Sequence, residues 1–312
     1  MDNLILSFNV VLPLLISIIL GYFLRQIKML DDPVVNSLNK LCFKVFLPVY
    51  LFHSIYTTNI SASFNGRLAL FGIAGVLAFF ALLMIVVPFL EKENPRRGVM
   101  IQAMFRSNFA LFGLPVAISI CGEQDIGPTS LMIGIIVPIY NILAVVTLET
   151  FRGGRPNPRK ITRGILTNPL IIASVLGVLL NLLKFPLPDA ILSSANSIGR
   201  VATPLALVAL GGRFQFSSIR SFRRQLAISV VGKLIISPVI MVLLGIALGF
   251  RNEMLIPILI MFAAPTAVSS FPMAQQMDGD SDLAAALVVF TTIFSIVTIF
   301  LWVFVLKQLG VR

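Results

Sequence analysis

The sequence is poor in charged residues, above all in acidic ones. Only 12% of its 312 residues are charged, whereas soluble domains carry about 25%. It also lacks any polar tract long enough to form a separate soluble domain. These shortages exclude an ordinary soluble protein. Together with a hydrophobic content of 57%, they indicate a chain that lies in a lipid bilayer.

Residues that hold metals or act as nucleophiles are scarce as well. The chain has two cysteines, Cys42 and Cys121, and one histidine, His53, all within or at the end of apolar runs. This usage gives no indication of a disulfide framework or a metal site, and we expect all three to be packing residues. Zinc-protease, serine-hydrolase, phosphate-loop and dinucleotide motifs are missing from the sequence. We therefore expect a protein that is not an enzyme and has no cofactor.

Apolar runs of about 20 residues, the length that crosses a hydrocarbon core of about 30 Å, recur along the whole chain. They predict an all-α polytopic membrane protein with ten transmembrane helices, nine being the other possible number. The ten runs are 7–25, 34–56, 66–90, 98–121, 128–151, 165–184, 190–212, 222–250, 253–276 and 281–307. The opening MDNLILSF lacks the basic start of a secretory signal, so we expect the first run to be retained.

Basic residues gather in alternate loops between these runs. The first, third, fifth and seventh loops hold fourteen Lys and Arg, and the opposite side holds five. Because basic loops stay in the cytoplasm, this asymmetry predicts a cytoplasmic (inner) membrane protein with both termini outside. The net charge of +11 then reflects topology, and no nucleic-acid partner is expected.

Two proline-interrupted segments suggest an internal repeat. The run 98–121 reads SNFALFGLPVA around Pro115, and the run 253–276 reads AAPTAVSSFPMA around Pro265. Five helices followed by five helices face opposite ways in the membrane. We therefore predict two inverted five-helix repeats, residues 1–155 and 156–312. Matching broken helices are typical of transporter binding sites near the bilayer midplane.

We expect the two broken segments to cross in the interior, because freed backbone groups are tolerated in lipid only where protein or water covers them. Half-helix N-termini would then aim positive dipole ends at a ligand. The polar side chains available there are Ser107, Asn108, Ser269 and Ser270. The alternative is that both prolines merely kink their helices.

Charged residues at membrane depth are almost all basic: Glu149, near a helix end, is the single acid beside Lys40, Lys44, Arg106, Arg200 and Lys233. Such charges are costly and usually functional. Lys40, Arg106 and Arg200 lie near enough to helix ends to reach the headgroups. Lys233 lies about a dozen residues into its run and is expected to be a buried countercharge or carbonyl partner near the crossing rather than a lipid anchor. The lack of carboxylates favours an anion over a metal cation as cargo.

Four stretches carry a family resemblance: LNKLCFKVFLPVYLFHSI (38–55), SNFALFGLP (107–115), TNPLIIAS (167–174) and AAPTAVSSFPMAQ (263–275). With Lys233 at a basic position, they resemble the auxin efflux carrier family, which includes the plant PIN-formed carriers and bacterial organic acid transporters. The resemblance implies that Asn108 and Asn168 bind a substrate carboxylate, that Leu47 lines the apolar part of the pocket, and that Pro115 and Pro265 are crossover prolines.

The resemblance also implies a fold of the sodium/bile-acid symporter and sodium/proton antiporter type. The first, second, sixth and seventh helices would form a scaffold and a homodimer surface, and the other six a moving, elevator-type transport domain. The expected function is export of small organic anions, such as auxin-like monocarboxylates or small dicarboxylates. A sodium-coupled symporter of bile-acid type and a non-transporting carboxylate sensor are the alternatives. Sodium binding stays open, because backbone carbonyls at broken helices can coordinate it.

Overall fold

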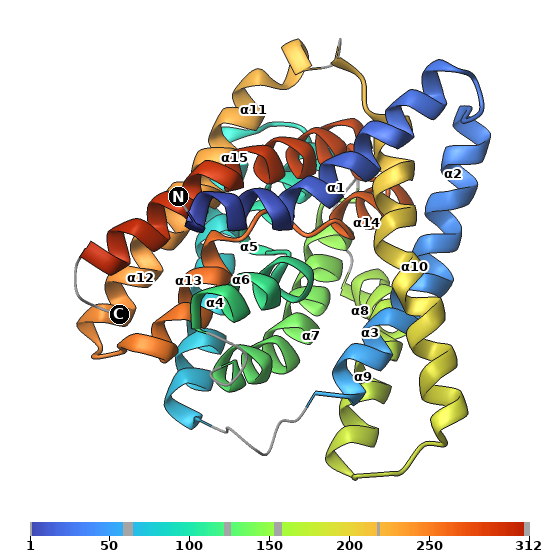
Figure 1. Ribbon diagram of the computed structural model, residues 1–312. Helices are drawn as coiled ribbons and strands as arrows, with labels where there is room; N and C mark the ends of the chain where they lie inside the picture. Colours follow the sequence, from blue (N-terminus) through green and yellow to red (C-terminus); the bar gives the residue numbers. More distant parts are fainter. Residues whose placement is uncertain (1, 59–64, 122–125, 153–157, 217–218, 309–312) are drawn as a thin grey trace.

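The computed structural model describes residues 2–58, 65–121, 126–152, 158–216 and 219–308, and nearly all of them are helical (Figure 1). The helices of the first part are α1 (Asp2–Gln26), α2 (Asp32–Leu41), η1 (Cys42–Phe46), α3 (Leu47–Tyr56), α4 (Gly66–Leu90), α5 (Asn94–Phe105), η2 (Phe109–Gly113), α6 (Leu114–Cys121) and α7 (Gly127–Thr150). Those of the second part are α8 (Pro158–Thr167), α9 (Pro169–Leu182), α10 (Asp189–Arg213), α11 (Ile219–Val231), η5 (Gly232–Ile236), α12 (Ser237–Ala247), η6 (Asn252–Met254), α13 (Leu255–Ala263), α14 (Ser270–Gln276) and α15 (Ser281–Gln308).

The predicted all-α class is confirmed, and each of the ten predicted runs coincides with one helix or with consecutive helices. Within the described residues, five helical segments are long and apolar enough to cross a membrane. They are Asp32–Tyr56, Gly66–Leu90, Gly127–Thr150, Ile219–Ala247 and Ser281–Leu306. The runs around α5–α6 and α13–α14 are interrupted halfway, which leaves each of their parts too short to span alone.

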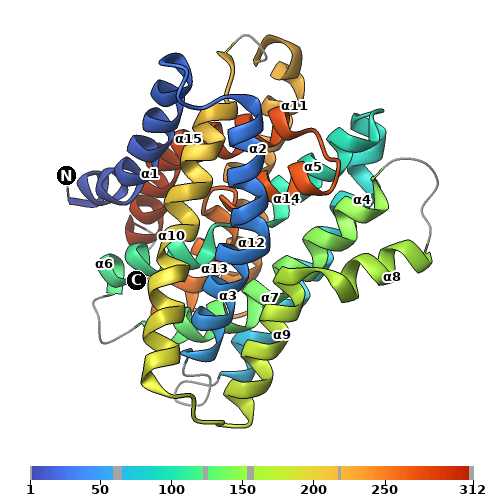
Figure 2. The same ribbon diagram turned by 90° about the vertical axis from the view of Figure 1, so that its right-hand side faces the viewer.

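The interrupted helices occupy the centre of the molecule. All nine residues of α13 are buried, and so is every residue of α5 from Gly98 to Phe105. By contrast, α10 lies at the outside with α2 and α3 beside it (Figure 2). The sequence prediction that the broken helices belong in the interior agrees with this arrangement.

Prolines in two of the long helices are accommodated by wider turns. A proline has no N–H and its ring clashes with the carbonyl four residues earlier. Just before Pro48, the N–H of Leu47 bonds to the carbonyl of Cys42, five residues back. The π-helical turn η5 ends in the same way just before Pro238. These π turns keep the helices continuous past the prolines.

Two glycines let α1 and α10 pack backbone to backbone. A Cβ on Gly21 would lie 2.0 Å from the Val208 carbonyl oxygen, and a Cβ on Gly211 would lie 2.0 Å from the Ile18 carbonyl oxygen. Gly177 of α9 approaches α3 less closely, since an added Cβ would lie 3.1 Å from the Phe52 carbonyl oxygen. Because these glycines are used within one chain, they do not mark a surface for the predicted homodimer.

A network of ion pairs joins the loops at one end of the molecule. The acidic loop 278–282 (DGDSD) contributes three aspartates, and each pairs with an arginine from a different basic loop. The pairs are Asp278 with Arg152 (2.8 Å), Asp280 with Arg96 (3.1 Å) and Asp282 with Arg213 (2.6 Å). Arg25 joins the network through Asp32 (2.9 Å), which also lies 3.7 Å from Arg213. The four loops predicted to share the cytoplasmic side therefore lie together.

Glu91 follows α4 and ties it to α5 and α11. Its Oε1 atom accepts hydrogen bonds from the backbone N–H groups of Lys92 (2.7 Å) and Glu93 (2.9 Å), and Oε2 accepts one from the Gln225 amide (2.6 Å). Burial alone would raise the pKa of this carboxyl. The hydrogen bonds, together with the charge of Arg96, outweigh burial and lower the pKa of Glu91 below its ordinary value.

A lowered pKa means that the ionised Glu91 stabilises the fold above the ordinary glutamate pKa, and that this stabilisation is lost as the pH falls through the lowered pKa. We expect Glu91→Gln to reduce the free energy of unfolding by about 1 to 2 kcal/mol at pH 7. The difference should shrink once the pH falls below about 4.3. Thermal unfolding of both proteins in detergent between pH 7 and pH 3 measures this, and a constant difference would contradict it.

Candidate functional site

The two broken segments cross as a short antiparallel bridge between Ser107 and Thr266. Both chains are extended here, after the ends of α5 and α13. Two backbone hydrogen bonds hold the crossing: Asn108 N–H to the Pro265 carbonyl (2.8 Å) and Ala267 N–H to the Arg106 carbonyl (3.2 Å). The backbone groups that the breaks expose therefore satisfy one another, which allows irregular structure inside a membrane protein.

The two prolines expected at the crossover do not occupy equivalent places. Pro265 lies in the bridge and is buried, whereas Pro115 is exposed in the first turn of α6, seven residues beyond Asn108. The expectation that Pro115 is a crossover residue is therefore wrong. A proline fits the first turn of a helix because its missing N–H would have no intrahelical partner there. In the second broken segment, the residue equivalent to Pro115 is Pro272 rather than Pro265, because Pro272 also lies in the first turn of the helix that follows the break.

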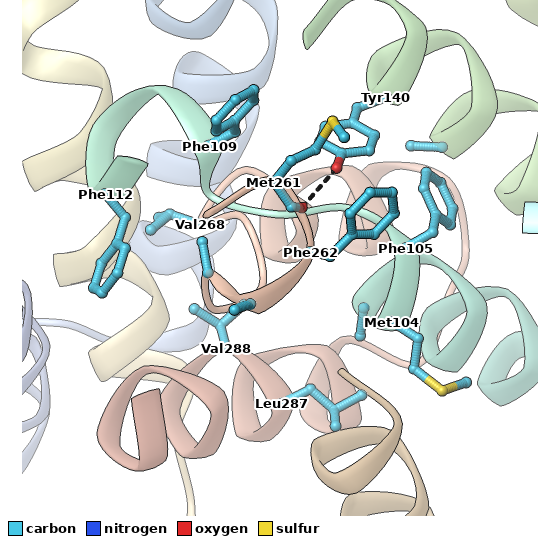
Figure 3. Close-up of a cluster of buried hydrophobic side chains, with 14 of the residues drawn as sticks. Met104, Phe105, Phe109, Phe112, Tyr140, Met261, Phe262, Val268, Leu287 and Val288 are labelled. Atoms are coloured by element: carbon cyan, nitrogen blue, oxygen red, sulfur yellow. Dashed lines mark hydrogen bonds between the residues drawn. The ribbon is translucent and has the colours of Figure 1, made fainter. Parts of the chain in front are cut away.

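Lys233 is fully buried and reaches the crossing from η5. Its Nζ donates a hydrogen bond to Ser107 Oγ, and that hydroxyl donates to the Met261 carbonyl. The Tyr140 hydroxyl donates to the same carbonyl at 2.9 Å, with Phe105, Phe109 and Phe262 among the buried side chains around it (Figure 3). Lys233 is thus hydrogen-bonded to the first broken segment through a neutral hydroxyl, and its role as a countercharge stays a prediction.

A cavity of about 50 Å³ adjoins the crossing, with room for about three or four water molecules. Its walls come from α3, the first broken segment, α7, α10 and the second broken segment. They consist of Leu47, Tyr50, Leu51, Arg106, Ser107, Asn108, Phe109, Val137, Tyr140, Asn141, Thr203, Ala206, Ala267, Val268 and Ser269. Of the predicted site residues, Leu47, Ser107, Asn108 and Ser269 line this cavity. Asn168, Ser270, Pro115, Pro265 and Lys233 do not.

Arg106 lies in the cavity wall and is only 3% exposed. The expectation that it reaches the lipid headgroups is wrong, because α5 ends at Phe105 and leaves Arg106 at the crossing. Its guanidinium donates from Nη2 to Asn141 Oδ1 (2.5 Å) and from Nη1 to Met273 Sδ (2.8 Å). Neither acceptor carries a charge, and no carboxylate among the described residues pairs with Arg106.

Two amide groups in the same cavity have free donors. Asn108 Nδ2 and Asn141 Nδ2 are both buried and have no hydrogen-bond partner among the described residues. Buried polar groups in proteins are nearly always paired, so these amides mark a place for an acceptor. A guanidinium and two amide donors form a set that suits the oxygens of an anion such as a carboxylate.

Asn141 was not among the predicted site residues. The available signal was a lone amide in the apolar stretch IVPIYNILAV of α7, since polar residues inside membrane helices usually face other helices or a cavity. Arg106 could have been predicted as a site residue because it directly precedes Ser107 and Asn108, where the helix is interrupted.

Asn168, which the resemblance implies binds a substrate carboxylate, caps a helix in the structure. It precedes α9 as its N-cap, and its Oδ1 accepts a hydrogen bond from the Leu170 N–H at 2.9 Å. The side chain is buried but is not part of the cavity wall. The structure therefore does not bring Asn168 together with Asn108.

The remaining candidates for chemistry lie apart from the cavity. Cys42 is buried and its thiol donates to the Ala202 carbonyl (3.3 Å), as expected of a packing residue. The Cys121 side chain lies outside the described part of the structure. Arg200 is exposed and bonds to Asn196. Among the described residues, no group of three or more His, Cys, Asp or Glu side chains could hold a metal ion.

A larger hollow of about 700 Å³ lies between α11–η5 and α15. Its walls are apolar except for Arg223 and Thr298, and exposed side chains such as Ile235, Phe294 and Val297 border it. It offers no converging polar groups, which small-molecule sites use to orient their ligands. The smaller cavity at the crossing is therefore the candidate site.

Comparison with known proteins identifies the family. Residues 6–161 and 154–303 match the family described as membrane transport protein. An uncharacterized transporter of Methanocaldococcus jannaschii is 23% identical over 96% of this chain and 98% of its own length. The "Putative malonate transporter" of Rhizobium meliloti (strain 1021) is 23% identical over 93% of both chains, and the uncharacterized transporter YfdV of Escherichia coli (strain K12) is 24% identical over 94% of this chain and 96% of its own.

These matches extend over nearly the whole chain and agree with the resemblance to auxin efflux carriers. The relatives carry the names of transporters. Together with the apolar helices, the matches establish that this multi-pass membrane protein belongs to the membrane transport protein family.

Proposed function

We propose that this protein is a secondary transporter that exports small organic anions across the cytoplasmic membrane. The observation that carries the proposal is the convergence of Arg106, Asn108 and Asn141 at the crossing, with free donors and no acidic side chain in the cavity wall. An anion would neutralise the guanidinium and accept hydrogen bonds from both amides. A metal cation would find neither a carboxylate nor a neutral imidazole in this wall.

The volume of the cavity limits the size of the substrate. At about 50 Å³ it has room only for the smallest carboxylic acids, so larger acids require movement of the walls. The name of the Rhizobium meliloti relative refers to malonate, which brings small dicarboxylates into consideration beside monocarboxylates. We propose small mono- and dicarboxylates as the class of substrate.

The proposed mechanism is alternating access in an elevator-type carrier. Ten transmembrane helices would form two inverted repeats, 1–155 and 156–312, with both termini outside. The helices α1, α2–α3, α8–α9 and α10 would make up the scaffold and the homodimer surface, and the remaining helices the transport domain. The cavity supports this division, because its walls come from α3 and α10 on one side and from both broken segments on the other.

The membrane potential suffices to drive export. An inside-negative potential is worth about 2.3 kcal/mol per charge per 100 mV, so a carboxylate leaves the cell downhill without a coupled ion. Currents from reconstituted protein on a solid-supported membrane test this with a panel of small mono- and dicarboxylates, with and without sodium. We expect sodium-independent currents for particular acids. Currents that require sodium would indicate a symporter instead, and ligand binding without current would indicate a sensor.

Asn108→Ala should reduce the initial rate of anion transport at least about tenfold, because a hydrogen bond to a charged group contributes about 1.5 to 3 kcal/mol. Transport by Asn196→Ala, which removes an amide from α10 outside the cavity wall, should stay near the wild-type rate. Initial currents at low substrate concentration compare the two variants. Equal rates for Asn108→Ala and the wild type would remove Asn108 from the site.

A further inference from the structure

Lys44 is a charged residue that neither the fold nor the proposed site explains. It lies in η1, in the middle of the continuous helical segment Asp32–Tyr56, twelve residues from either end. With a rise of about 1.5 Å per residue, its Cα is about 18 Å from each end of the segment. A lysine at that depth is too far from the ends to reach the headgroups by extending its side chain.

The Lys44 side chain is nevertheless exposed, and it forms no hydrogen bond or ion pair with the part of the chain that the structure describes. An unpaired ammonium group facing hydrocarbon at the middle of a bilayer is strongly unfavourable. The group must therefore face water or an anion. Leu41, about one turn earlier, and Val45, the next residue, are 48% and 44% exposed, and being apolar they suit a surface that faces lipid.

Lys44 continues a line of polar side chains on α2. Asn36, Lys40 and Lys44 follow one another at intervals of four residues, the spacing of one helical turn, and all three are exposed. The line starts near Asp32, in the ion-pair network at the end of the molecule predicted to be cytoplasmic. One turn beyond it, Leu47 lines the cavity. The line therefore runs from the basic end of the molecule toward the site.

This face of α2 adjoins the second broken segment. Gln275 of α14 donates a hydrogen bond to Asn36 Oδ1 (2.6 Å) and accepts one from Asn39 Nδ2. In Figure 2, α8 extends to the right, away from α2. The polar line thus lies at the border of α14, the helix that begins directly after the cavity residue Ser269.

We propose that Asn36, Lys40 and Lys44 line a water-filled approach along which organic anions pass between the cytoplasmic face and the cavity. The two ammonium groups raise the local concentration of anions, as like charges along a cleft do. The statement about anions rests on the proposed function, whereas the statement about water access does not.

Water access is tested with Lys44→Cys and Val45→Cys, both combined with Cys42→Ala to remove the neighbouring thiol. The two positions lie at nearly the same depth and are both exposed. A difference between their reaction rates therefore reports the face of the helix on which each one lies. A membrane-impermeant trimethylammonium methanethiosulfonate reacts only with thiolates in water. Added to inverted membrane vesicles, it should modify Cys at position 44 at least about tenfold faster than Cys at position 45. Equal rates, or modification of position 44 from the outer face alone, would overturn the proposal.

The role of the charge is tested on the same variants. Lys44→Cys should raise the KM for a transported carboxylate about tenfold, with little change at saturating substrate. An aminoethyl methanethiosulfonate, which restores a positive charge, should return KM toward the wild-type value, and a sulfonatoethyl reagent should raise it further. Val45→Cys should respond to neither reagent. An unchanged KM in a protein that is modified at position 44 would show that Lys44 does not attract the anion. A wild-type protein without carboxylate currents would instead contradict the proposed function.

Discussion

Replacing Arg106 with glutamine is expected to reduce the initial rate of organic-anion transport at least about 100-fold. Truncating one member of a buried charged contact costs about 2 to 5 kcal/mol, and 2.7 kcal/mol corresponds to a factor of about 100. Arg106 is buried in the cavity wall and has only neutral partners, Asn141 and Met273. The substrate would therefore supply its counterion. Uptake into proteoliposomes, or currents on a solid-supported membrane, measures the rate.

Two further variants separate loss of function from loss of fold. Arg200→Gln removes an exposed arginine from α10 and should transport at the wild-type rate. Asn141→Asp places a carboxylate beside the guanidinium, 2.5 Å from Nη2 in the present geometry. This variant should fold as well as the wild type but transport poorly, because the charge of Arg106 is already neutralised. Full transport by Asn141→Asp would show that the substrate does not pair with Arg106.

The replacement of Gly211 by alanine is expected to have the largest effect on stability. Its Cβ would lie 2.0 Å from the Ile18 carbonyl oxygen, and a backbone atom in a packed helix cannot turn aside as a side chain can. Overpacking typically costs about 1 to 3 kcal/mol and occasionally more, and we expect about 3 kcal/mol or more here, from separation of α1 and α10. Gly21→Ala, on the facing helix, should behave in the same way.

Gly98→Ala is the matched control, because its Cβ would meet the nearest side-chain atom, Phe151 Cβ, at an ordinary 3.4 Å. It should change the unfolding free energy by less than about 1 kcal/mol. Thermal unfolding in detergent, followed by size-exclusion chromatography of the soluble fraction, compares the three variants. Equal melting temperatures for Gly211→Ala and Gly98→Ala would contradict the backbone contact between α1 and α10.

Much of the fold could be predicted because the bilayer imposes simple rules. Apolar runs of the required length mark helices, and each of the ten predicted runs contains one helix or several consecutive helices. The polar residues and prolines in the runs 98–121 and 253–276 also indicated interrupted helices, since irregular backbone must be covered by protein. The prediction of a buried Lys233 followed from its depth in an apolar run, which does not depend on knowing its neighbours.

The details of the site depended on where each interruption falls. Proline was taken as the point of interruption, yet α5 ends ten residues before Pro115, at Phe105. This early end moves Arg106 from the expected headgroup region into the cavity wall. Asn141 was missed because α7 is buried on most sides, so hydrophobic periodicity does not tell which of its faces adjoins the crossing. Such contacts between distant segments have no local signal in the sequence.

The ion-pair network also bears on how the chain is inserted. Arg25, Arg96, Arg152 and Arg213 all precede the acidic loop 278–282 in the order of synthesis. During translation at the ribosome, three of these arginines emerge long before their aspartate partners exist. While the helices enter the translocon, the acidic loop does not yet neutralise these arginines, so they would be able to retain their loops in the cytoplasm, as the charge asymmetry predicts. Once the last loop has been made, it pairs with the same arginines, so that one set of residues would first direct insertion and later hold the finished protein together.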